Sequence, residues 1–246
     1  MLCAFVPRGL SALLSALRRL PIPDGMYFLS AVLAVLGLFV LGPRAGFAAA
    51  EQKLAPDDGY QYEVLADIGR LTTVSDPVYD NSGSYVARPH VGFRFYTSAL
   101  DRQVEATELP ITVPRAIRSQ GCTALLLDAR FRGLPPTLIR FLSAHFQPYD
   151  ADLWLWGQRF SSSLAPVVFE AVRDADYFVE PETVATGGGF TIDENPVQTP
   201  VFHVSRGEHR VQYSGSVRQF SVLWLPADGQ RYRPKYGLHP QFSSIF

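Results

Sequence analysis

The chain has 246 residues, of which 47% are hydrophobic and 13% aromatic, and its formal net charge is −1. A charge so close to zero excludes the basic surface typical of nucleic-acid-binding proteins, so no nucleic-acid partner is expected. The two cysteines, Cys3 and Cys122, fall on opposite sides of the apolar segment described below, which argues against a disulfide framework. No cysteine or histidine pair has metal-ligand spacing, and we expect neither a metal nor a cofactor.

Residues 1–50 are expected to form a cytoplasmic leader followed by a membrane helix. In the leader, Leu10–Leu17 is apolar and is followed by Arg18 and Arg19. Two interpretations remain open for this stretch. It is either an amphipathic helix lying on the inner leaflet, or the remnant of a helix from a membrane hairpin.

The uncharged run Met26–Gly42 predicts a membrane-spanning helix at residues 26–42. Its length is close to the minimum of about 17 residues that cross the hydrocarbon core of a bilayer. Ala48–Ala50 offer the small residues of a signal-peptidase site. However, Pro43 and Arg44 separate these alanines from the run, and we favour a retained span over a cleaved signal.

The distribution of arginines predicts the orientation of this span. Arg8, Arg18 and Arg19 precede it, whereas Arg44 alone follows closely. An excess of basic residues marks the cytoplasmic side. The prediction is therefore a single-pass protein of the inner membrane, with its N-terminus in the cytoplasm and residues 51–246 exported to the periplasm. The lipid bilayer is its first expected partner.

The exported part predicts an α+β fold with two regions, a small α/β unit over residues 51–162 and a β-sandwich over residues 163–246. In the first region, helix patterns alternate with strand patterns, and strand–helix–strand succession with short joints favours a parallel sheet with right-handed crossovers. A helix is expected at Tyr60–Leu71, where Tyr62, Leu65 and Ile68 have the spacing of an apolar stripe. Further helices are expected at Pro114–Gln120, with proline in its first turn and Gly121 at its end, and at Leu134–Phe146. Strands are expected at Asp76–Asp80, Cys122–Leu127 and Asp152–Phe160, and the continuous apolar run Cys122–Leu127 is typical of a strand covered on both faces.

The second region is predicted to consist of short strands separated by turn residues, as is typical of a β-sandwich. Ser205–Glu208 lies between two alternating segments and is interpreted as a hairpin loop. Gly187–Gly189 lacks the following lysine of a nucleotide-binding loop and is interpreted as a joint. The expected strands are Val167–Val172, Tyr177–Val179, Phe190–Ile192, Val201–Val204, His209–Tyr213 and Phe220–Leu225.

Several short strings in the exported part resemble the exported C-terminal region of bacterial polytopic GT-C-type glycosyltransferases, the lipid-phosphosugar-dependent enzymes related to protein mannosyltransferases and aminoarabinose transferases. The resemblance covers roughly Tyr60–Leu225 and the preceding span. The strings that carry it are Ser75–Asp80, Arg88–His90 with Phe93 and Phe95, Leu134–Pro136, His145–Asp150, Leu153–Gly157 and Leu223–Gly229.

The resemblance implies a protein that lacks the catalytic core of such enzymes. Their catalytic acid lies on the first exported loop of a many-span membrane domain, and no residue of this chain matches it. The implied function is a membrane-anchored accessory or binding module that acts with a polytopic membrane glycosyltransferase or other membrane subunits on a glycan or a lipid-linked sugar. No catalytic residue is assigned. The alternatives are a structural subunit of a membrane complex and an envelope hydrolase that uses exported carboxylates.

Six side chains are candidate ligand-binding residues. Carboxylates accept hydrogen bonds from sugar hydroxyls, and arginine binds phosphate or carboxylate groups with two parallel hydrogen bonds. An acidic residue directly after a buried strand lies where open α/β sheets place ligands. An exposed tryptophan in an alternating strand stacks on sugars. For each candidate, a purely structural role is the alternative. The six residues are Asp76, Asp80, Arg88, His90, Asp128 and Trp154.

Overall fold

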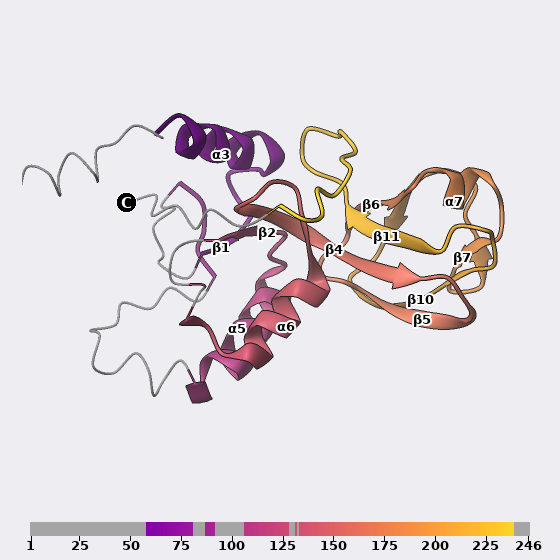
Figure 1. The fold of residues 1–246 in the computed structure, drawn as a ribbon, viewed down its shortest axis with the longest axis horizontal. Helices are drawn as coiled ribbons and strands as arrows, with labels where there is room; N and C mark the ends of the chain where they lie inside the picture. Colours follow the sequence, from indigo (N-terminus) through magenta and orange to yellow (C-terminus); the bar gives the residue numbers. More distant parts are fainter. Residues whose placement is uncertain (1–57, 81–86, 92–105, 128–130, 132, 239–246) are drawn as a thin grey trace, which may run out of the picture. The chain divides into compact units, whose positions relative to one another are not determined.

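Two β-sheets and three principal helices make up the part of the chain that the computed structural model describes, residues 58–80, 87–91, 106–127, 131 and 133–238 (Figure 1). The described residues belong to one compact unit. The predicted leader and the span at 26–42 lie outside the described residues. Among the helices that are described, none is both long and apolar enough to cross a membrane.

The larger sheet has seven strands of mixed direction, in the order β1-β2-β4-β11-β6-β9, with β3 paired to β4. Among the described strand pairs of this sheet, β1–β2 is parallel and the others are antiparallel. The strands are β1 (Val78–Asp80), β2 (Ala124–Leu126), β3 (Phe146–Pro148), β4 (Leu153–Ser161), β6 (Ala175–Glu180), β9 (Val201–Val204) and β11 (Gln219–Trp224).

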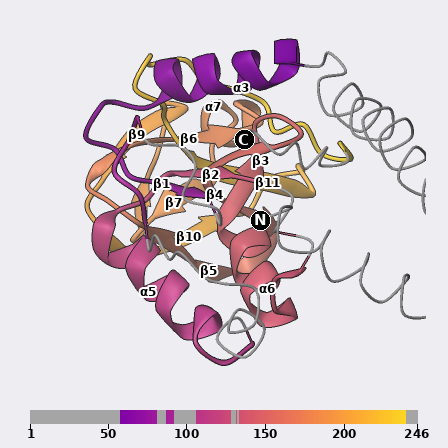
Figure 2. The same cartoon turned by 90° about the vertical axis from the view of Figure 1, so that its left-hand side faces the viewer.

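Helices cover both faces of the sheet at its β1–β2 end. Helix α3 lies on one side, and α5 and α6 lie together on the other (Figures 1 and 2). Residues Cys122–Leu127, which include β2, are accordingly all buried, which confirms the prediction of a strand covered on both faces. The helices are α3 (Asp58–Leu71), α5 (Leu109–Gln120), α6 (Pro136–His145) and the short α7 (Thr183–Thr186).

The parallel unit predicted from the sequence is confirmed for β1 and β2, which α5 connects, but not for β4. Strand β4 runs antiparallel to β2. The reason is β3, which follows α6 and pairs antiparallel with β4 through the tight turn between them. Strand β3, which follows α6, therefore runs in the same direction as β2. Strand β4 lies between β2 and β3 and is antiparallel to both.

Helices α3 and α5 differ from their predicted patterns in detail. Val64 and Ile68 face the core, whereas Tyr62, expected on the apolar stripe, is 70% exposed. Helix α5 begins before Pro114, so this proline lies inside the helix and not in its first turn. The predicted end is confirmed, since Gly121 caps the helix with φ 68° and its amide donates to the carbonyl of Arg118.

The smaller sheet has the order β5-β10-β7-β8 and is antiparallel throughout. Aromatic contacts join it to the larger sheet. The ring centroids of Phe169 in β5 and Tyr177 in β6 lie 5.3 Å apart, and those of Phe190 in β7 and Phe220 in β11 lie 5.7 Å apart. Strand β4 leads directly into β5. The strands are β5 (Ser163–Ala171), β7 (Phe190–Ile192), β8 (Asn195–Pro196) and β10 (Gly207–Tyr213).

All six strands predicted for residues 163–246 are present, but their partners differ from a simple succession of hairpins. Ser205–Glu208 is not a hairpin loop, because β9 pairs with β6 in the larger sheet while β10 pairs with β5 and β7 in the smaller one. Three strands of residues 163–246, namely β6, β9 and β11, belong to the same sheet as β4. The two regions predicted for residues 51–162 and 163–246 thus share one sheet.

Candidate functional site

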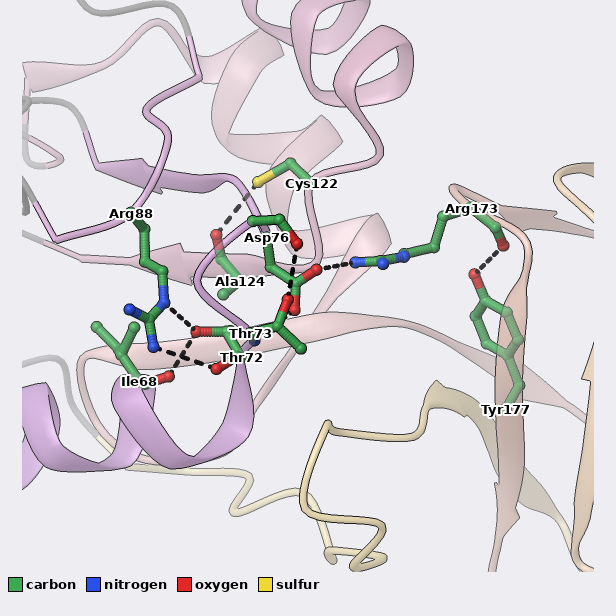
Figure 3. A network of polar contacts seen from close by, with 10 residues as sticks. Ile68, Thr72, Thr73, Asp76, Arg88, Cys122, Ala124, Arg173 and Tyr177 are labelled. Carbon is green, nitrogen blue, oxygen red and sulfur yellow. Dashed lines mark hydrogen bonds and ion pairs between the residues drawn. The ribbon is translucent and has the colours of Figure 1, made fainter.

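Asp76 belongs to a buried network that joins the α3–β1 loop to the β5–β6 turn (Figure 3). Its Oδ1 accepts a hydrogen bond from Arg173 Nη1 at 2.6 Å, and its Oδ2 accepts one from the Thr73 amide at 2.6 Å. Burial alone would raise the pKa of this carboxyl, but the bonds from Arg173 and Thr73 outweigh burial and hold the pKa below its usual value. The carboxylate is ionised and fully engaged inside the fold.

Arg88 closes the C-terminal end of α3 (Figure 3). Its Nη2 donates to the carbonyls of Gly69 and Thr72, both at 3.2 Å, and its Nε donates to Thr72 Oγ1 at 3.0 Å. The last carbonyls of a helix lack partners within it and carry partial negative charge, so a guanidinium stabilises them. Arg88 thus binds oxygens of Gly69 in α3 and of Thr72 just after it, and not the carboxylate or phosphate considered from the sequence.

Asp80 and His90 form a second internal pair at the end of β1. The Asp80 side chain is fully buried, and its Oδ1 lies 2.8 Å from His90 Nε2. The segment that carries His90 runs alongside β1, since the Val78 amide donates to the carbonyl of Pro89 and the Val91 amide donates to that of Val78. This arrangement matches the structural role considered for Asp80 at a strand end.

Cys122 lies beside the Asp76 network and is equally internal (Figure 3). It is buried, and its thiol donates to the carbonyl of Ala124 at 3.3 Å. Burial raises the pKa of this thiol to about 12. Because the thiolate is the reactive form of cysteine, Cys122 packs as a small apolar residue and is not a nucleophile at neutral pH.

Trp154 lies elsewhere, in the wall of a cavity of about 430 Å³ between β3, β4, the end of α6 and the segment that follows β11. It is the one predicted site residue that lines this cavity. Asp76, Asp80, Arg88 and His90 do not, and Asp128 lies outside the described residues. The lining residues are Ser143, Ala144, Phe146, Gln147, Pro148, Trp154, Arg159, Lys235, Tyr236, Gly237 and Leu238.

Hydrogen bonds fix the polar wall of the cavity. The Tyr236 hydroxyl donates to Gln147 Oε1 at 2.9 Å and lies 2.9 Å from Ser221 Oγ, while Gln147 Nε2 donates to the carbonyl of Gly157 at 3.2 Å. Burial raises the pKa of the Tyr236 hydroxyl, so it stays protonated and keeps this orientation. The Lys235 amide donates to the carbonyl of Pro148 and fastens the same segment to β3.

Two cations complete the lining. The Arg159 guanidinium lies over the Tyr236 ring, 4.1 Å from its centroid, and donates to Gln219 Oε1. The Lys235 ammonium lies 3.8 Å from Asp150 Oδ1. The described residues that line the cavity contribute no carboxylate. Within the described part of the chain, no three histidine, cysteine, aspartate or glutamate side chains come together as a metal site.

The lining combines aromatic surface with an amide, a hydroxyl and two cations, and groups of these kinds could contact a polar ligand with flat apolar faces. Sequence reasoning found Trp154 from its alternation in β4 but missed Gln147, Arg159, Lys235 and Tyr236. No local pattern could have joined them, because the C-terminal segment reaches β3 only through the tertiary fold. Comparisons of the chain with protein family models, with curated proteins and with solved structures found no match.

Proposed function

We propose that this chain is a membrane-anchored, exported binding module for cell-envelope carbohydrate, related to the exported region of GT-C-type glycosyltransferases and acting beside a polytopic membrane partner. The observation that carries the proposal is the cavity in which Trp154 and Tyr236 lie with Gln147, Arg159 and Lys235. In this proposal the partner supplies the catalytic residues, and this chain holds the glycan or lipid-linked sugar.

The lining suits carbohydrate because a sugar ring combines apolar C–H faces with a rim of hydroxyls. Trp154 is partly exposed and Tyr236 is 44% exposed, so both rings are accessible for stacking against a sugar face. The exposed Ser143 hydroxyl supplies a donor and an acceptor for sugar hydroxyls, while the buried Gln147 amide holds Tyr236 in place. A volume of about 430 Å³ is in the range of small-molecule sites.

A hydrolase that uses the exported carboxylates has less support. Glycosidases use two carboxyl groups that flank the scissile bond across an open site. Asp76 and Asp80 are 2% and 0% exposed, and each is bonded inside the fold. The binding function is therefore the better proposal for the described residues.

The proposal predicts that Trp154→Ala weakens binding of envelope-derived oligosaccharides by about five- to thirtyfold, because it removes the stacking surface, worth roughly 1–2 kcal/mol. The measurement is isothermal titration calorimetry on the full chain in detergent micelles. Trp154→Phe keeps an aromatic plane and should retain most of the affinity.

Tyr62→Ala is the matched control for this experiment, since it removes an aromatic ring that is 70% exposed on α3 and does not line the cavity. Its affinity should equal that of the unaltered chain. Circular dichroism checks that each variant is folded. Equal affinities for Trp154→Ala and the unaltered chain, or an absence of oligosaccharide binding at millimolar concentration, would contradict the proposal.

Retention of the predicted span is a separate expectation. After expression in a bacterial host, the chain should sediment with the inner membrane and resist extraction with high salt, since burial of an apolar helix and not surface charge holds it there. The intact mass of the purified protein should include residues 1–50. A soluble periplasmic product whose mass lacks residues 1–50 would show that the segment is a cleaved signal.

A further inference from the structure

Arg159 lines the cavity, and no carboxylate of the described residues balances its charge. Arg70, Arg118, Arg173, Arg231 and Arg233 each form an ion pair with a carboxylate. Among the described residues, Arg159 forms no ion pair, because its partners are the neutral amide of Gln219 and the ring of Tyr236. Its side chain is exposed at the cavity, so its positive charge is not neutralised there.

Lys235 adds a second, partly balanced charge to the same cavity. Its ammonium is exposed and lies 3.8 Å from Asp150 Oδ1, which is an ion-pair contact but longer than a hydrogen bond. Lysine has three donors, so this contact leaves donors available to a ligand. The other nearby carboxylate, Glu180, is bound to Arg233 at 2.8 Å and does not line the cavity.

Two cations therefore line the cavity, and Asp150, which contacts Lys235, is not among the lining residues. An arginine fixed by an amide and an aromatic ring is pre-oriented, and a guanidinium matches the two oxygens of a carboxylate or phosphate. A free inorganic anion would leave the adjacent aromatic groups without a partner, whereas an acidic sugar offers a ring to the aromatic groups and a charge to the cations.

We infer that the cavity selects acidic glycans, in which the sugar carries a carboxylate or a phosphate that Arg159 and Lys235 bind while Trp154 stacks on the ring. This inference rests on the proposed carbohydrate-binding function and adds the charge of the ligand to it. Neutral sugars bind through stacking and hydrogen bonds alone, and therefore more weakly.

The test compares matched charged and uncharged probes on the full chain in micelles by calorimetry. The carboxylate arm uses trigalacturonate against trigalactose, and the phosphate arm uses glucose 6-phosphate against glucose. We expect the acidic member of at least one pair to bind about tenfold or more tightly at low salt, with the difference shrinking as salt screens the exposed cations.

Arg159→Gln should lower the affinity for the acidic probe about tenfold and lower the affinity for its neutral counterpart much less, so the ratio of the two affinities should fall. Arg159→Lys keeps a charge and should restore part of the preference. Arg210→Gln removes an exposed arginine of β10 that does not line the cavity, and it should behave as the unaltered chain.

The outcomes separate the inference from the function on which it rests. Equal affinities for acidic and neutral probes, both dependent on Trp154, would overturn acidic selectivity and leave carbohydrate binding intact. An acidic preference that survives Arg159→Gln unchanged would also overturn the inference, since the charge would then be recognised elsewhere. Binding of neither member of either pair would overturn both.

Discussion

Arg173→Gln is expected to lower the free energy of unfolding by about 2–3 kcal/mol at pH 7. Arg173 is the cation bonded to Asp76, whose side chain is only 3% exposed. Removing one partner of a buried ion pair leaves the other charge without compensation inside the protein, which typically destabilises a fold by about 3–5 kcal/mol. The lower estimate allows for the 34% exposure of the Arg173 side chain. Urea denaturation followed by circular dichroism measures the change.

A double-mutant cycle isolates this interaction. Asp76→Asn removes the charge but keeps an oxygen for the Thr73 amide, and the double variant Asp76→Asn/Arg173→Gln should be more stable than the sum of the single losses implies. Arg233→Gln is the matched control, because it breaks an ion pair whose arginine is 83% exposed. Surface pairs contribute about 0–1 kcal/mol. A loss for Arg173→Gln no larger than that for Arg233→Gln would refute a stabilising role for the network.

The second large effect is an acid-induced loss of stability that depends on Glu170. The carboxylate of this β5 residue is bonded to Arg118 of α5 at 2.6 Å and lies 3.3 Å from His145 Nε2 of α6. Burial would raise the pKa of Glu170, but the interactions with His145 and Arg118 outweigh burial and lower the pKa to about 2. The ionised carboxylate therefore fastens both helices to the strand.

The direction of the pH dependence follows from this lowered pKa. The unfolded chain takes up a proton on Glu170 near its ordinary pKa of 4.5, whereas the folded chain does so only near 2. The contribution of Glu170 is thus present above about pH 5 and is lost as the pH falls towards 2. Its size is on the order of 2 kcal/mol, since the partly exposed Arg118 is screened by solvent.

Glu170→Gln should accordingly destabilise the protein by about 2 kcal/mol at pH 7 and have little effect at pH 2. The measurement is urea denaturation at several pH values between 2 and 7. Glu63→Gln, which alters an exposed carboxylate on α3, is the control and should follow the profile of the unaltered chain. Parallel profiles for Glu170→Gln and the unaltered chain would contradict the assignment.

The elements of the fold were largely predictable because they depend on neighbours in the chain. The apolar run Cys122–Leu127 predicted a strand buried on both faces, and Gly121 predicted the end of α5, where a positive φ favours glycine. Tyr62 shows the limit of this reasoning. The helix around Tyr62 was predicted correctly, but the face of α3 that meets the core is the one with Val64 and Ile68, because that face packs against the rest of the fold.

The candidate site was predictable only in part. Asp76, Arg88 and His90 were singled out because their chemistry suits ligands, and the structure instead gives their hydrogen bonds to Arg173, to the end of α3 and to Asp80. Polar groups inside a protein must be paired, and the same side chains that bind ligands also satisfy this requirement. Residue type therefore does not distinguish the two roles.

The sequence by itself determined the places of most helices and strands, though not of β3, β8 and α7, and the parallel β1–β2 unit. Only the tertiary structure decided that β4 is inserted antiparallel beside β2, that β9 and β10 belong to different sheets, and that Arg159 and Lys235 meet at one cavity. The physical reason is that periodicity reports which face of an element is buried, whereas strands pair through backbone groups that nearly every residue possesses. Those pairings, and the cavity they enclose, arise from packing between segments far apart in the chain.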